Sequence, residues 1–140
     1  MRGRVTRSRS VGAFVPVLAL LLVSCSSGST PGSTVAGLTS KKVSAGSIEV
    51  TMTPRQLDSR GARFDIALDT HSGDLGLDVA RSSTLEVAGR PWQPARWSGD
   101  GPGGHHCSGT LEFPRGGPTS GTIRLVIGGL PAPVAAVWQR

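Results

Sequence analysis

The sequence lacks an apolar run long enough to cross a membrane as a helix. Its longest apolar stretch, from Val11 to Val23, has about 13 residues, whereas a membrane-spanning helix needs about 20. No later segment is more apolar. We therefore expect no membrane span, because a short apolar stretch near the start of a chain suits the core of an export signal.

Motifs of the common enzyme classes are also missing. The glycine-rich run Gly99–Gly104 is interrupted by Pro102 and is not followed by Lys-Ser or Lys-Thr, so it lacks the features of a phosphate-binding loop. No GxSxG turn is present to hold a serine nucleophile. These absences predict a protein that is not an enzyme.

The surplus of basic residues is small once the first residues are set aside. The chain has 15 Lys and Arg against 9 Asp and Glu, but four arginines lie within the first nine positions: Arg2, Arg4, Arg7 and Arg9. The remainder therefore holds eleven basic against nine acidic residues, a net charge of +2. Without an arginine-rich helix or a stacking platform, this charge excludes nucleic acid as a partner.

The first 25 residues combine the features of an exported lipoprotein. Basic residues precede the apolar stretch, which ends in Leu22-Val23-Ser24-Cys25. These four residues resemble the lipobox of bacterial lipoproteins. The resemblance implies that residues 1–24 are a cleaved signal peptide and that Cys25 carries lipid. Because two or three acyl chains bind a membrane firmly, we expect the protein to be lipid-anchored at the extracytoplasmic face of the cell membrane.

Acylation of Cys25 leaves Cys107, the other cysteine of the chain, without a partner for an internal disulfide.

Residues 25–45 contain mainly Ser, Gly, Thr and Pro, a composition that buries too little apolar surface to fold. We therefore predict that this segment joins the acylated cysteine to the rest of the protein as a flexible tether.

From residue 46 onward, apolar and polar residues alternate in short segments. The alternation covers residues 48–53, 64–69, 75–79, 85–87, 111–113, 123–127 and 134–138. No window of helical length has apolar residues at spacings of three and four. About seven short strands separated by Gly, Pro, Ser and Asp predict an all-β fold over residues 46–140. An immunoglobulin-like β-sandwich is favoured, with a small β-barrel as the alternative.

Two segments break the alternation, residues 69–74 and 89–108, and together they contain all three histidines and Cys107. Imidazole and thiolate ligands suit copper or zinc, so five residues form a candidate metal site: His71, His105, His106, Cys107 and Asp69. In a strand, His105 and Cys107 would point to one side and His106 to the other. In the competing interpretation the histidines fasten the glycine-rich loop and Cys107 is a buried apolar residue.

The second segment also contains two tryptophans, Trp92 and Trp97, which suggest two hypotheses. If the rings are exposed beside the histidines, they would form a binding loop within an apolar patch. A domain of this size, however, needs most of its large apolar residues to fold, which favours places in or beside the core.

The segments Phe64–Ser72 and Gly103–Gly109 resemble paired motifs of an uncharacterised group of secreted bacterial β-domain proteins. The resemblance implies no activity. It does imply a polar residue at the position of Cys107, which would favour a metal site made of His71, His105 and His106.

Our main prediction is a non-enzymatic lipoprotein whose sandwich domain binds a protein or small ligand and has no cofactor. The alternative is a copper- or zinc-binding lipoprotein that uses His71 and His105 or His106.

Overall fold

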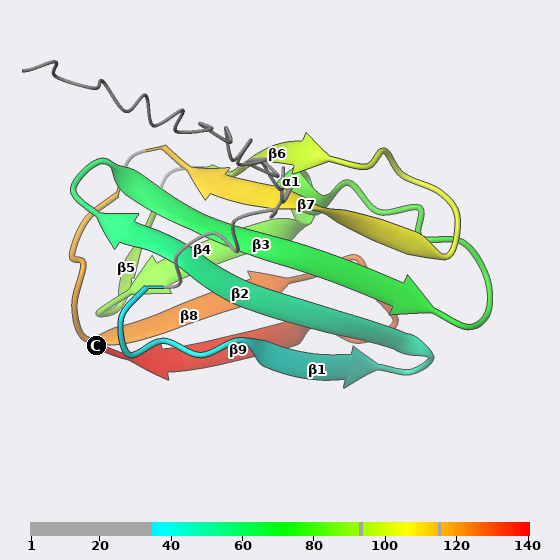
Figure 1. The fold of residues 1–140 in the computed structure, drawn as a ribbon, viewed down its shortest axis with the longest axis horizontal. Coiled ribbons are helices and arrows are strands. Elements are labelled where there is room, and N and C mark those ends of the chain that lie inside the picture. The colour runs from blue at the N-terminus through cyan, green and yellow to red at the C-terminus, as the bar shows by residue number, and fades with distance from the viewer. Residues whose placement is uncertain (1–34, 93, 115) are drawn as a thin grey trace, which may run out of the picture. The chain divides into compact units, whose positions relative to one another are not determined.

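The computed structural model describes residues 35–92, 94–114 and 116–140, which fold as two antiparallel sheets packed face to face (Figure 1). The predicted all-β sandwich is confirmed, and the two sheets do not close into a barrel. The first sheet has the strand order β1-β2-β3-β7-β6, and the second has the order β5-β4-β8-β9. The first sheet contains β1 (Lys41–Ala45), β2 (Ile48–Asp58), β3 (Gly61–Thr70), β6 (Arg96–Gly99) and β7 (His106–Phe113). The second contains β4 (Ser83–Val87), β5 (Arg90–Pro91), β8 (Thr122–Ile127) and β9 (Val134–Gln139).

The alternation seen in the sequence sets the two faces of each sheet. Along β3, Phe64, Ile66 and Leu68 are buried between the sheets, while Asp65 and Asp69 lie on the outer face. The inner faces meet in a core in which the rings of Phe64 and Phe113 pack edge to face, with centroids 6.3 Å apart. Trp138 packs on Phe64, and its indole Nε1 donates to the Thr39 carbonyl at 2.7 Å. Burial of these alternating side chains therefore holds the two sheets together.

The predicted strand at residues 75–79 is wrong. Leu75 and Val79 are buried, but residues 75–78 form a connection without strand pairing, and Val79 begins a single helical turn, α1 (Val79–Ser82). The Asp78 side chain accepts from the Arg81 amide at 3.1 Å and caps this turn. Alternating burial arises here because the chain crosses from one sheet to the other while its apolar side chains fill the core.

Three strands were not predicted from the sequence. β5 and β6 lie in the segment 89–108, and β1 lies within residues 25–45, which were predicted to be a tether. β1 is polar because it is an edge strand: Val43 and Ala45 turn inward, while Lys42 and Ser44 face solvent. Lys42 Nζ lies 2.8 Å from Glu49 Oε1 on β2. The folded domain therefore begins before residue 46, and Leu38 is already buried.

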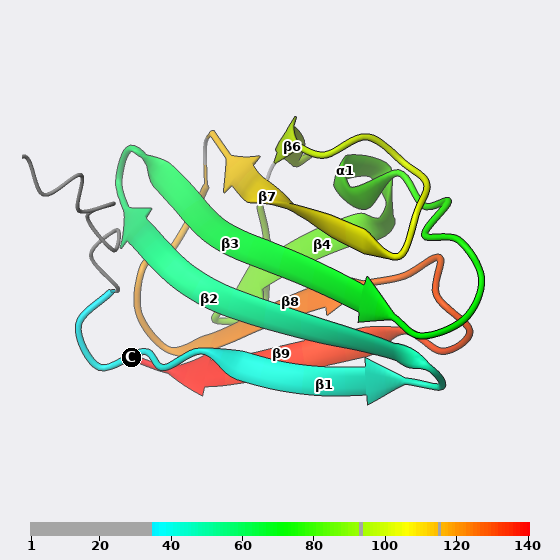
Figure 2. The ribbon, with the colours of Figure 1, turned by 45° about the vertical axis from the view of Figure 1, so that its right-hand side comes forward.

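The strands place the connecting loops at two opposite ends of the sandwich (Figure 2). We call one end the base: it contains Val35, whose amide donates to the Pro54 carbonyl at 3.2 Å, and Arg140, whose Nη1 donates to the Leu57 carbonyl at 2.6 Å. We call the other end the tip: it contains the turn at 46–47 and the loops 71–78, 100–105 and 128–133. In the part of the chain that the structure describes, no helix has the length and hydropathy required to cross a membrane.

Candidate functional site

The two segments that interrupt the alternation lie together at the tip. Loop 71–78 and loop 100–105 are joined by two backbone hydrogen bonds, from the Leu75 amide to the Gly104 carbonyl (2.9 Å) and from the Gly103 amide to the Leu75 carbonyl (2.7 Å). A third runs from the amide of Thr70, the last residue of β3, to the His105 carbonyl (2.9 Å). We call residues 71–78 and 100–105 the paired loops. Their joining makes one continuous surface from segments about thirty residues apart in the sequence.

Glycine is required in the paired loops for backbone conformation. Gly103 and Gly104 have φ angles of 119° and 73°, and a Cβ at either position would meet nothing within 4 Å. Space is therefore not the constraint, and the left-handed backbone alone disfavours other residues there. The turn formed by these two glycines brings the chain into β7 at His106.

Asp100 fastens the second of the paired loops to β7. Its Oδ2 accepts from the Ser108 amide at 2.8 Å and from Ser108 Oγ at 3.0 Å, and its own amide donates to the Ser108 carbonyl at 2.9 Å. The hydrogen bonds from the Ser108 backbone and side chain lower the pKa of the Asp100 carboxyl. Asp100 is not among the residues predicted for the site, although an aspartate beside a glycine is a common turn residue whose side chain accepts hydrogen bonds from the nearby backbone.

His106 and Asp69 form a pair on the outer face of the first sheet. The two residues are cross-strand partners on β7 and β3, and His106 Nδ1 lies 2.5 Å from Asp69 Oδ1. The His106 side chain is 79% exposed, so its other ring nitrogen stays accessible at the edge of the tip. Asp69, named among the candidate metal ligands, therefore contacts the ring of His106 across the two strands.

Cys107 points in the opposite direction from His106. It is 2% exposed within the core, and its Sγ lies 3.8 Å from the Asp100 carbonyl oxygen. Burial, followed by the charge of Asp100, raises the pKa of the thiol. The thiol is therefore held neutral and away from the imidazoles, as expected from the alternation of side chains along a strand.

The five residues of the predicted metal site do not form a ligand cluster. His71 and His105 are exposed at the same end of the sandwich, but Cys107 faces the core and Asp69 contacts His106. Among residues 35–92, 94–114 and 116–140, no group of three or more His, Cys, Asp or Glu side chains could hold a metal ion. The copper or zinc alternative therefore has no set of ligands in the part of the chain that the structure describes.

The tryptophans do not form the predicted exposed binding loop. Trp92 is 7% exposed, and its buried Nε1 has no hydrogen-bond partner among the described residues. Trp97 is half-buried at the edge of the core beside Gly99 and Gly109, and its Nε1 donates to the Asp100 carbonyl at 2.8 Å. Trp92 therefore lacks the exposure that the binding-loop hypothesis requires, and Trp97 has only part of it, because these large rings complete a small core.

A cleft of about 370 Å³ opens at the tip beside the first of the paired loops. One side is polar and contains Ser47, Ser72 and Asp74, and Ser72 Oγ donates to Ser47 Oγ at 3.2 Å. The other side is apolar and includes the half-buried side chains of Ile48, Leu77 and Leu130. The cleft has no signature in the sequence, because three segments distant in the sequence form it.

Comparison with known proteins found no matching family model, no matching curated protein and no matching solved structure.

Proposed function

We propose that this protein is a non-enzymatic lipoprotein, anchored through Cys25, whose sandwich domain binds a partner with its tip. The observation that supports the proposal is the arrangement of the two ends. The chain enters the domain at the base, where Val35 contacts Pro54, whereas the paired loops and the 370 Å³ cleft lie at the opposite end. A domain anchored at its base would present the tip to the surroundings.

The chemistry of the cleft indicates the kind of partner that would fit. Asp74 lies at the polar side, is exposed, and has no hydrogen bond or ion pair with another described residue. An apolar side chain could pack against Ile48 and Leu77 while a neighbouring basic group met the Asp74 carboxylate. We therefore expect a protein partner that presents an apolar residue beside a lysine or arginine.

Anchoring is tested by metabolic labelling with a radioactive fatty acid. The chain is expected to incorporate label, and the Cys25→Ala variant is expected to lose it and leave the membrane fraction. Labelling that persists in Cys25→Ala would overturn lipid attachment at this residue.

Binding at the tip is tested in cells with a photo-crosslinking amino acid. It is placed at Ser72 in the cleft, and, as a matched control, at Val137, which is 42% exposed on the second sheet. A discrete adduct is expected from Ser72 and not from Val137, and Asp74→Lys should abolish it. The same adduct pattern from both positions would show that the tip has no special role.

A further inference from the structure

The charges of the sandwich are separated between its base and its tip. Among the described residues, the half nearer the base contains seven arginines and three acidic side chains, a side-chain charge of +4. These are Arg55, Arg60, Arg63, Arg90, Arg96, Arg124, Arg140, Asp58, Glu86 and Glu112. The half nearer the tip contains two basic and five acidic side chains, a charge of −3. These are Lys42, Arg81, Glu49, Asp69, Asp74, Asp78 and Asp100. Lys41 and Asp65 lie near the middle, and Asp65 forms an ion pair with Arg55.

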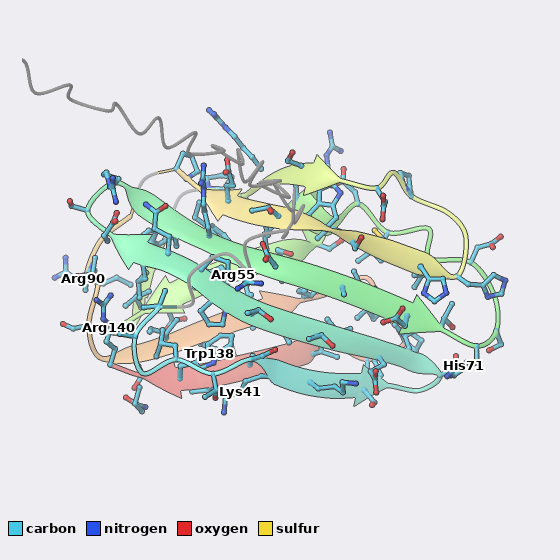
Figure 3. All side chains as sticks on the ribbon, viewed as in Figure 1. Lys41, Arg55, His71, Arg90, Trp138 and Arg140 are labelled. Atoms are coloured by element: carbon cyan, nitrogen blue, oxygen red, sulfur yellow. The ribbon has the colours of Figure 1, made fainter. Side chains whose placement is uncertain are left out.

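Several guanidinium groups at the base are available to an external anion. Arg90 and Arg96 are exposed and form no ion pair with another described residue. Arg60 is paired with Asp58, yet its side chain is 81% exposed. A cleft of about 380 Å³ lies at the base, and Arg60 and Arg63 both line it. Figure 3 shows Arg90 and Arg140 at one end of the sandwich and His71 at the other.

We infer that the base of the domain docks on the anionic lipid surface of the membrane that holds its anchor. The inference rests on the proposed lipid anchor. Only ten positions separate Cys25 from Val35, and ten residues extend to about 36 Å at most, so the base lies within reach of the lipid headgroups. Basic side chains near an anionic surface are attracted within a Debye length of about 8 Å, and the acidic tip is repelled. The charge separation therefore orients the domain with its base on the membrane and its tip outward.

The test uses the full-length lipidated chain in vesicles of phosphatidylcholine, with or without about 30% phosphatidylglycerol as the anionic lipid. A fluorophore is attached at Ser59→Cys in the base or, in a second protein, at Gly101→Cys in the tip. Both positions are exposed, and a Cβ at Gly101 meets nothing within 4 Å. Cys107 is buried, so labelling of the folded protein is directed to the introduced thiol. Lipids with a nitroxide on the headgroup quench whichever fluorophore lies near the surface.

On anionic vesicles the label at Ser59→Cys is expected to be quenched more strongly than the label at Gly101→Cys. The difference should disappear on neutral vesicles and in about 0.5 M salt, which shortens the Debye length. The double variant Arg60→Glu, Arg90→Glu should lower the ratio of docked to undocked protein by about tenfold or more. The matched control, Lys42→Glu with Arg81→Glu at the tip, should leave docking intact.

Failure of docking can be distinguished from failure of the anchor. If the chain floats with neutral vesicles and the two labels are quenched equally on anionic ones, the anchor stands and docking is overturned. If the chain does not float with neutral vesicles, the anchor fails. In that case docking is judged only from flotation with anionic vesicles. Flotation that salt abolishes would support docking, and no flotation would overturn it. Equal effects of the base and tip variants would also overturn docking.

Discussion

Gly116 lies directly against the indole of Trp92. A Cβ at Gly116 would lie 2.0 Å from Trp92 Cδ2 and 2.1 Å from Cε3, well inside van der Waals contact. The loop after β7 therefore closes over the ring, and the absence of a side chain at Gly116 is what permits Trp92 to be buried. This contact explains how a tryptophan outside any strand becomes part of the core.

We predict that Gly116→Ala destabilises the protein by about 2 kcal/mol or more, because the ring or the loop must move to admit one methyl group. The matched control is Gly117→Ala, where the nearest atom to a new Cβ is Arg90 Cβ at 4.0 Å. That substitution should change stability by less than about 0.5 kcal/mol. Urea unfolding followed by tryptophan fluorescence measures both values. Equal stabilities of the two variants would mean that the loop does not hold Trp92 in place.

The core strands could be predicted from the sequence because each presents one face to the core. β2, β3, β4, β7, β8 and β9 all contain alternating segments recognised in the sequence. β1 was missed because an edge strand contributes only Val43 and Ala45 to the interior and is otherwise polar. Residues 75–79 have the alternation of apolar and polar residues that is typical of a strand, although the chain there crosses between sheets. Alternation of apolar and polar residues indicates which side chains are buried. Hydrogen bonding to a neighbouring strand is what distinguishes a strand from an irregular segment.

The site was predicted less completely than the fold. The opposite directions of His106 and Cys107 followed from strand alternation, whereas the pairing of Asp69 with His106 depends on the register between β3 and β7. The joining of those loops depends on backbone hydrogen bonds of Leu75 with Gly103 and Gly104, which no side-chain pattern encodes. The same holds for Asp100, whose role depends on its place opposite Ser108.

Asp100→Asn should lower the melting temperature at neutral pH, because a neutral amide replaces the carboxylate that accepts two hydrogen bonds from Ser108. The folded protein lowers the pKa of Asp100, so its contribution is present above the unfolded value of 3.8 and is lost as pH falls through the lower folded value. The difference in melting temperature between wild type and Asp100→Asn should therefore shrink in acid. Calorimetry from pH 7 to low pH measures it.

The control for Asp100 is Asp74→Asn, since Asp74 is exposed and has no partner among the described residues. This variant should match the melting temperature of wild type at neutral pH. A difference for Asp100→Asn that does not change with pH would contradict the role of its charge.

Cys107 should react slowly with thiol reagents in the folded protein. Burial raises its pKa, so less thiolate is present at a given pH than for an exposed cysteine, and the reagent must wait for local opening. We expect modification at least about 100-fold slower in native protein than in denaturant, because exposure of a core residue requires substantial unfolding. Absorbance after addition of an aromatic disulfide measures both rates, with Cys25→Ala used so that a single thiol is followed. Rapid native reaction would place the thiol at the surface.

Added zinc or copper is expected to leave the melting temperature unchanged. His106 Nδ1 contacts Asp69, Cys107 faces the core, and no described cluster provides three ligands, so metal would meet single exposed imidazoles at the tip. A ligand that binds only the folded state at 100 times its dissociation constant stabilises that state by about 2.7 kcal/mol, a shift that calorimetry resolves easily. The measurement compares wild type with the triple variant His71→Ala, His105→Ala, His106→Ala under reducing conditions. A rise of several degrees in wild type alone would show that these histidines gather around a metal, and would replace partner binding with metal binding as the role of the tip.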